Sequence, residues 1–281
     1  MMRNSSTILL GFILFASVSL VQSSDEERDW KTAYGTPVSG ASPFVARISI
    51  ANLGQVGSLC SGTLISNRHV LTAAHCFMES TTSETGHIHR YTNVDKYRSR
   101  VVLKESMSKR ISNIYVHAEY AYRQTLSADI AVIELANPVP YDQFSPLKIA
   151  DYRIVRRDES PIVDIAGWGF NPRYPDHVPS PRLERVTVQS YSCRSYGYAD
   201  DVICLDERWQ SACSGDSGSG LIVRKYKADY LVGVFVAGPN CTHMIGGGDY
   251  ARTPGIAIDI RKHSRFINDI NENRLSKLYV I

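Results

Sequence analysis

The segment Ser211–Val223, SACSGDSGSGLIV, places Ser217 between two glycines and directly after an aspartate. A serine hydroxyl is a poor nucleophile unless a base removes its proton and nearby donors receive the negative charge that develops on the substrate. The glycines allow a tight turn that can aim two N–H groups at one point, a geometry that Cβ atoms would obstruct. The segment therefore raises the question of whether the chain supplies a base for Ser217.

Two other residues fit the remaining roles. A base for Ser217 should be a histidine, and a carboxylate should hold that histidine in the right tautomer. His75 closes the strand-like run VLTAAHC, and Asp129 opens the apolar run DIAVIEL, where an unpartnered carboxylate would be costly to bury. Taken singly, these features also fit a core histidine, a turn residue and a glycine loop. A triad explains all three placements together.

These motifs, with GWG at Gly167 to Gly169, occur in the order found in the trypsin/chymotrypsin-like serine peptidases. The chain resembles that family from Thr32 to Ile270. The resemblance implies an all-β fold of two antiparallel six-stranded β-barrels, with the active site in the cleft between them and a C-terminal helix.

The resemblance also implies the role of each site residue. Ser217 would attack the scissile carbonyl, His75 would take and return the proton, and Asp129 would orient the imidazole. The backbone N–H groups of Gly215 and Ser217 would form the oxyanion hole. No cofactor is implied, and the partners would be protein or peptide substrates, an activating protease and protein inhibitors.

The six cysteines are an even number, as paired disulfides require, and their spacing alone leaves fifteen pairings open. The family resemblance implies one of these pairings: Cys60 with Cys76, Cys193 with Cys204, and Cys213 with Cys241. No cysteine lies in a CxxC pair, and His87 and His89 have no evident third ligand, so no metal site is expected.

The elements that must position these residues are predominantly strands. Short β-branched runs alternate with turn residues in Phe44–Ile50, HVLTAA, DIAVIEL, PIVDIAG, ERVTVQ, GLIVR, YLVGVFVAG and GIAIDI. A helix is predicted only near the end, where Ile260, Phe266, Ile267 and Ile270 share one face. The Ser/Thr-rich segment Glu79–Gly86 is expected to be an exposed loop, and Asn137–Tyr152 to cross between the two halves.

The N-terminus indicates export. Arg3 precedes an apolar run from Ile8 to Val21, which is short for a membrane span and ends in small residues suited to signal peptidase. We therefore expect a signal peptide over 1–23, a short propeptide over 24–31 and the peptidase domain over 32–281. The protein would be secreted and monomeric, with no membrane attachment after cleavage. Its net charge of +3 is too scattered to indicate nucleic-acid binding.

In the resembled family, a cut after a basic residue frees an amine that pairs with the aspartate before the nucleophile, here Asp216. The new N-terminus aligns best at Thr32, after Lys31, with Arg28 as another candidate for the cut. Threonine departs from the family's Ile or Val at this position.

The residues that would set substrate preference align with Ser211 at the base of the pocket and with Gly238 and Gly255 on its walls. Ser211 carries no charge for Lys or Arg, and two glycines leave room for a large side chain. The expectation is cleavage after aromatic or large apolar residues, with elastase-like cleavage after smaller ones as the nearest variant.

Two other functions stay open on the sequence. One is a non-catalytic homologue that binds or regulates a partner. Two departures from the family pattern favour it: Thr32, and Val236 where the family has serine. GDSGSG also contains the GxSxG pattern of ester hydrolases, but the β-rich surroundings and the upstream LTAAHC contradict that fold.

Overall fold

The chain divides into two units, Met1–Trp30 and Lys31–Ile281, and the residues that the structure describes all belong to the second. The structure is a computed structural model, and it describes residues 36–37, 42–53, 57–83, 88–104, 106–122, 127–171, 183–207, 210–239, 254–274 and 279–281. The predicted signal peptide and propeptide therefore lie outside the described residues. Within these ranges, no helix has the length and apolar character needed to cross a bilayer.

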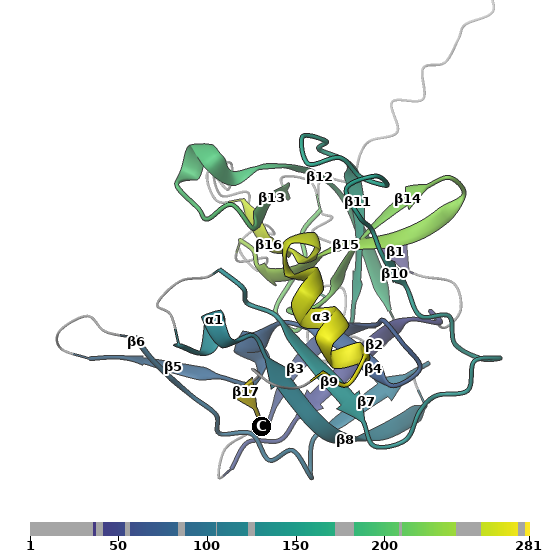
Figure 1. Ribbon diagram of the computed structural model, residues 1–281, viewed down its shortest axis with the longest axis vertical. Coiled ribbons are helices and arrows are strands. Elements are labelled where there is room, and N and C mark those ends of the chain that lie inside the picture. Colours follow the sequence, from purple (N-terminus) through teal and green to yellow (C-terminus); the bar gives the residue numbers. More distant parts are fainter. Residues whose placement is uncertain are drawn as a thin grey trace, which may run out of the picture. The chain divides into compact units, whose positions relative to one another are not determined.

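The first half of the described chain forms a closed barrel of six antiparallel strands, in the lower half of Figure 1. The strands are β2 (Val45–Ile50), β3 (Ser58–Leu64), β4 (His69–Thr72), β7 (Arg100–Leu103), β8 (Met107–Val116) and β9 (Ala131–Leu135). Their hydrogen-bonded order is β8-β7-β2-β3-β4-β9, and β9 pairs back with β8. Inward-facing apolar side chains such as Ile48, Leu71 and Ile133 are fully buried in its core.

The second half forms another closed antiparallel barrel of six strands, in the upper half of Figure 1. The strands are β11 (Ile162–Gly167), β12 (Glu184–Ser192), β13 (Val202–Asp206), β14 (Gly220–Lys225), β15 (Ala228–Ala237) and β16 (Gly255–Asp259). Their order is β12-β11-β14-β15-β16-β13, and β13 closes onto β12. The short β1 (Thr36–Pro37) pairs with β12, and β10 (Lys148–Ile149) pairs in parallel with β15. The expected double-barrel fold is confirmed.

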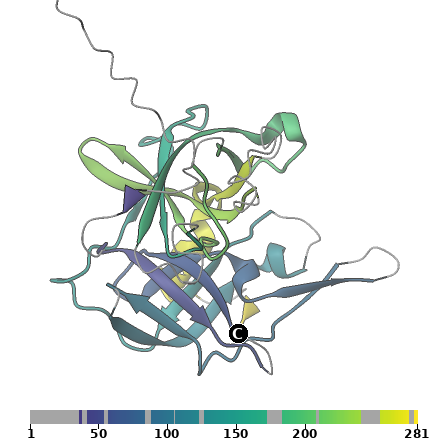
Figure 2. The same cartoon turned by 180° about the vertical axis from the view of Figure 1, so that it is seen from behind.

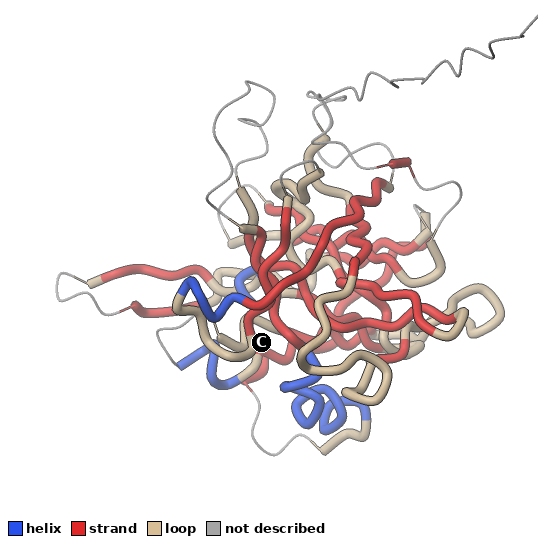
Figure 3. Tube along the Cα trace, turned by 90° about the horizontal axis from the view of Figure 1, so that it is seen from above, coloured by secondary structure: helices blue, strands red, loops and turns tan. Residues whose placement is uncertain are grey.

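The chain crosses from the first barrel to the second between β9 and β11, in the segment that the sequence marks as a crossing. It returns through a 3-10 turn, Ile260–His263, and the helix α3 (Ser264–Asn271) to β17 (Tyr279–Val280), which pairs with β8. Figure 2 shows the two barrels from behind, and Figure 3 shows how little of the described chain is helical. The predicted helix is confirmed, although Ile260 belongs to the 3-10 turn.

Two sequence expectations were wrong. Glu79–Thr82, expected within an exposed loop, is strand β5, and it pairs with β6 (Ile88–Tyr91) in a hairpin that projects from the first barrel. Serine is common in loops whereas threonine favours strands, so ESTT gives no clear composition signal. A second helix, α1 (Ala118–Tyr122), was missed because five residues are too few to develop a helical period.

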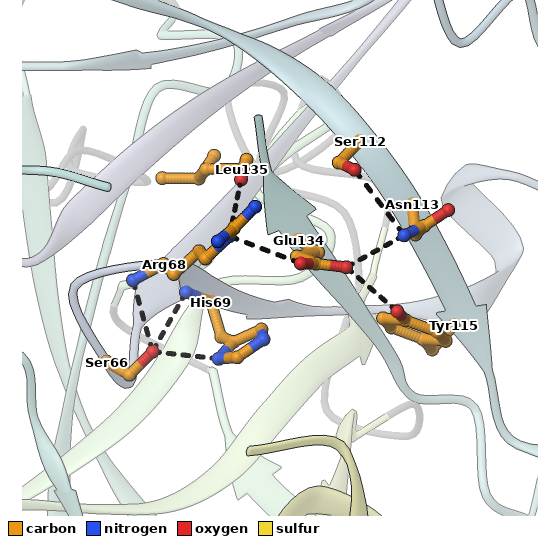
Figure 4. A network of polar contacts seen from close by, with 8 residues as sticks. All are labelled: Ser66, Arg68, His69, Ser112, Asn113, Tyr115, Glu134 and Leu135. Carbon is orange, nitrogen blue, oxygen red and sulfur yellow. Dashed lines mark hydrogen bonds and ion pairs between the residues drawn. The ribbon is translucent and has the colours of Figure 1, made fainter. Parts of the chain in front are cut away.

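A polar network joins β4, β8 and β9 where the first barrel closes (Figure 4). The Glu134 carboxylate accepts hydrogen bonds from Asn113 Nδ2 and from the Tyr115 hydroxyl, both at 2.8 Å. It also pairs with Arg68 Nε at 3.2 Å, and Arg68 Nε donates to the Leu135 carbonyl. These bonds connect neighbouring strands, so they support the register in which β9 pairs with β4 and β8. Asp129 lies just before β9, so its position depends on that register.

Candidate active site

His75 and Asp129 meet at one end of the first barrel. His75 lies in a 3-10 turn after β4, and Asp129 lies just before β9, which pairs with β4. The His75 ring Nδ1 lies 2.8 Å from Asp129 Oδ2, and the His75 backbone N–H donates to Asp129 Oδ1 at 2.9 Å. The carboxylate is buried and binds both the ring and the backbone of the histidine, so it fixes the orientation of the imidazole.

The charge of Asp129 also changes the acidity of His75. Burial of the imidazole lowers its pKa, but the Coulombic attraction of Asp129 and the hydrogen bond to it outweigh burial. The pKa of His75 is therefore raised above its ordinary value. Such a histidine holds an accepted proton more firmly than an isolated one, which suits a base that must later return the proton as an acid.

The loop that carries Ser217 belongs to the second barrel but is bonded to the first through Ser61 of β3. The Ser61 N–H donates to the Ser217 carbonyl at 2.8 Å, and the Ser61 hydroxyl donates to the Gly215 carbonyl at 3.0 Å. The same hydroxyl accepts from Trp168 N at 3.1 Å. Cys76, next to His75, has its Sγ 3.9 Å from the Ser217 carbonyl oxygen. The backbone of Ser217 thus lies beside the segment that carries His75.

Two glycines of this loop have positive φ, +94° at Gly215 and +89° at Gly218. A Cβ on Gly218 would come closer than 3.0 Å to Thr72 Oγ1 and to the Ser61 carbonyl oxygen. Both the conformation and the close approach therefore require glycine. Within the described part of the chain, the N–H groups of Gly215 and Ser217 donate no hydrogen bond, so they are available to an acceptor.

The Asp216 carboxylate points into the GWG segment that the sequence singled out. Asp216 Oδ1 accepts from Gly169 N and Oδ2 accepts from Cys213 N, both at 2.8 Å. A Cβ on Gly167 or on Gly169 would collide with this carboxylate, which explains both glycines. Burial raises the pKa of Asp216 to about 6, against the opposing effect of the two N–H donors. Among the described residues, no cation forms an ion pair with Asp216.

A cavity of about 300 Å³ opens beside Ser217. Its lining residues are Ala212, Cys213, Ser214, Ser217, Phe235, Ala237, Gly238 and Pro239. A larger cavity of about 410 Å³ lies among β11, β12 and β13, but neither His75, Asp129 nor Ser217 lines it. The contact with Ser217, rather than size, makes the smaller cavity the candidate substrate pocket.

Of the three residues predicted for the pocket, only Gly238 lines this cavity. Ser211 is buried and donates its hydroxyl to the Ala212 carbonyl at 2.8 Å. Gly238 and Gly255 both lie against the carboxylate of Glu207, a residue to which the sequence analysis gave no role.

A buried carboxylate of the second barrel supports the turn before Asp129. Asp201 Oδ2 accepts from Ser127 Oγ at 2.9 Å, from Ala128 N at 2.9 Å and from His263 Nε2 at 2.8 Å. Ala128 has φ of +58°, a conformation that costs a non-glycine residue about 1 kcal/mol or more. Asp201 therefore holds in place a strained turn that leads directly into Asp129.

We predict that Asp201→Asn removes about 2 kcal/mol of stability at neutral pH. Burial raises the pKa of Asp201, but His263, Ala128 N–H and Ser127 together lower it to about 2. Because the folded pKa lies below the unfolded value of about 3.9, this stability is present above pH 4 and is lost as pH falls toward 2. Urea unfolding at pH 7 and pH 3 measures it: the gap between wild type and variant should narrow at pH 3.

The exposed Asp142 supplies the control for this prediction, because Asp142→Asn makes the same chemical change without a buried partner. A gap of equal size at both pH values would mean that the Asp201 contacts stabilise the fold by packing and not by charge.

Two of the pairings implied by the family resemblance are present as disulfides. Cys60 bonds to Cys76 beside His75, and Cys193 bonds to Cys204, the middle residue of β13. Cys241, the expected partner of Cys213, lies outside the described residues, as does Thr32.

Comparison with known proteins agrees with this geometry. A family model described as Trypsin matches residues 35–265. The chain belongs to the trypsin family. It is 28% identical over 226 residues to Trypsin delta of Drosophila erecta, covering 77% of this chain and 82% of that protein. It is 25% identical over 279 residues to Trypsin-like protease try-5 of Caenorhabditis elegans, covering 82% and 83%.

A further relative of this trypsin-family protein is much longer. Mannan-binding lectin serine protease 1 of Rattus norvegicus is 26% identical over 222 residues, which make up 72% of this chain but only 30% of that protein. The similarity therefore concerns less than a third of the longer protein.

Sequence reasoning missed three residues that shape the site: Ser61, Asp201 and Glu207. Ser61 and Asp201 act through contacts with residues more than 70 positions away, which a local pattern does not reveal. Glu207 carried a usable signal, since it lies between Cys204 and Cys213, close in sequence to the expected pocket base.

Proposed function

We propose that this protein is a secreted serine endopeptidase in which Ser217, His75 and Asp129 form the catalytic triad. The observation that carries the proposal is the hydrogen bond between the buried Asp129 carboxylate and His75 Nδ1. Hydrogen bonds from Ser61 hold the Ser217 loop beside the segment that carries His75. Membership of the trypsin family and two disulfides support it. The disulfides and the apolar leader also support secretion.

In the proposed reaction, His75 Nε2 takes the hydroxyl proton of Ser217 as its Oγ attacks the scissile carbonyl. The N–H groups of Gly215 and Ser217 donate to the oxyanion of the tetrahedral intermediate. His75 returns the proton to the leaving amine, which breaks the peptide bond and leaves an acyl-enzyme. Water, deprotonated by His75, then releases the acid product and restores Ser217.

Activation is proposed to follow cleavage after Lys31, which would give Thr32 a free amine that pairs with Asp216. Thr36 pairs with Arg185 of β12, and Arg185 pairs with Ala166 of β11. Thr36 therefore lies two strand spacings, about 10 Å, from Ala166, which directly precedes the GWG segment that contacts Asp216. Four residues from Thr36 to Thr32 span up to about 14 Å, which is enough. An amine there would give the buried carboxylate a counter-ion.

The experiment measures initial rates of the purified secreted protein on peptide substrates before and after cleavage at Lys31, with N-terminal sequencing of the active form. The cleaved protein should hydrolyse peptides, and a fluorophosphonate should label Ser217 as located by mass spectrometry. An active form that begins at another residue would overturn the assigned activation site but not the peptidase.

The rival function is a non-catalytic member of the family that binds a partner through the same cleft. Absence of both hydrolysis and fluorophosphonate labelling in the cleaved protein would favour it. The expected preference for apolar side chains rested on the uncharged Ser211 at the pocket base, and it did not include the carboxyl group of Glu207.

A further inference from the structure

The side chain of Glu207 is buried and only half satisfied. It is 4% exposed, and its Oε1 accepts a hydrogen bond from Ala212 N at 2.8 Å. Its Oε2 is also buried and has no hydrogen-bond partner among the described residues. A buried carboxylate oxygen without a donor is costly and rare in native structures, so it calls for an explanation such as a functional role or a bound molecule.

The free oxygen lies against two glycines. A Cβ built on Gly255 or on Gly238 would come closer than 3.0 Å to Glu207 Oε2. Neither glycine has a positive φ, so the backbone conformation does not demand glycine at these positions. The glycines are instead needed because a side chain on either would collide with the carboxylate.

Glu207 does not itself line the cavity beside Ser217, but it contacts residues that do. Two of the cavity's lining residues, Ala212 and Gly238, are the ones that contact Glu207. Gly238 presents no side chain between Oε2 and the cavity, so a substrate side chain that enters the cavity approaches the free oxygen.

We propose that Glu207 is the specificity-determining residue of this pocket and that the pocket takes a cationic Lys or Arg side chain, whose charge pairs with Glu207 Oε2. This inference rests on the proposed peptidase function and replaces the apolar preference expected from Ser211. An Arg or Lys side chain supplies N–H donors and a positive charge, and Oε2 lacks both.

The acidity of the Glu207 carboxyl has a consequence for the binding of a cation. Burial raises the pKa of Glu207 to about 8, and the charge of Asp216 adds to the rise, against the opposing effects of the Ala212 N–H donor and the nearby Ser211 hydroxyl. Around neutral pH the carboxyl therefore holds its proton in the absence of a ligand. A cationic side chain would favour the ionised form and release that proton.

Binding of benzamidine, an aromatic amidinium cation, tests the inference without requiring catalysis. Calorimetry is carried out on Ser217→Ala protein cleaved at Lys31, with and without Glu207→Gln, and with neutral benzamide as the second ligand. We expect Glu207→Gln to weaken benzamidine binding by about 100-fold, as loss of one partner of a buried charge pair does, and to leave benzamide binding within about threefold. Glu272→Gln is the matched control, because Glu272 is an exposed glutamate that directly follows α3.

The pH dependence separates the proposed role from a folding defect. In protein with Glu207 intact, benzamidine affinity should rise between pH 7 and 9 as the carboxyl ionises, a range above the titration of the neighbouring Asp216. Glu207→Gln should abolish this rise while the melting temperature shows that the protein is folded. Equal benzamidine affinity in the two proteins, or tighter binding of benzamide than of benzamidine to the protein that retains Glu207, would overturn the inference. Because all of these proteins carry Ser217→Ala, the binding result does not depend on whether the unaltered protein hydrolyses peptides.

Discussion

Replacing Ser217 with alanine is expected to lower kcat of the cleaved protein by about 10⁶-fold, the size of loss seen when a triad serine is removed from a serine peptidase. The substitution removes the only atom that can form the acyl-enzyme in the proposed mechanism, while the N–H donors at positions 215 and 217 stay on the backbone. Binding of substrate should change little. Active-site titration and steady-state rates on a peptide substrate measure the effect.

Ser145→Ala is the control, because it makes the same chemical change at an exposed serine. Ser145 lies in the segment that crosses between the two barrels, more than 70 positions before Ser217. Ser145→Ala should keep full activity. If Ser217→Ala retained more than about 1% of the rate, the nucleophile would have to be another group, and the proposed triad would be wrong.

Asp129→Asn is expected to lower kcat/KM by about 10⁴-fold near neutral pH, the magnitude known for this substitution in the trypsin family. The asparagine amide can donate a hydrogen bond to His75 Nδ1, which places the ring proton on Nε2. A protonated Nε2 cannot accept the hydroxyl proton of Ser217. The structure gives Asp129 two bonds to His75, to the ring and to the backbone N–H, so the change affects both.

The pH profile tests the electrostatic part of this role. The acid limb of kcat/KM in the unaltered enzyme should have its midpoint above the ordinary histidine value of about 6.5, because Asp129 raises the pKa of His75. Without that charge, burial acts alone and the midpoint should move to lower pH. A profile that keeps its midpoint after Asp129→Asn would assign the acid limb to a group other than His75.

The sequence predicted much of the fold because several separated motifs agree. HVLTAA, DIAVIEL and GIAIDI each became a strand, and their order along the chain matched one family. The candidate triad was predicted for a similar reason: His75 and Asp129 each stand at one end of an apolar run, where a polar side chain needs an explanation, and Ser217 stands in a glycine-rich turn. Strands without a strong apolar pattern, such as β5 and β8, were not predicted.

The contacts that support the site were not predictable in this way. Ser61 looks like any small residue in a strand, and its role depends on the approach of a loop 154 residues later. Glu207 was overlooked for a related reason. The family position of Ser211 was considered alone, whereas the structure shows that the short path from Cys204 to Cys213 brings the Glu207 carboxylate to Gly238 and Gly255.

The bonds from Ser61 to the Ser217 loop have a consequence for how the enzyme would lose activity under stress. They join the two barrels through the main chain of Gly215 and Ser217, so any partial opening of the barrel interface must break them. Such openings occur in folded proteins at free energies below that of global unfolding. Peptidase activity should therefore respond to denaturant before the secondary structure does, and would serve as a sensitive reporter of whether the two barrels are docked.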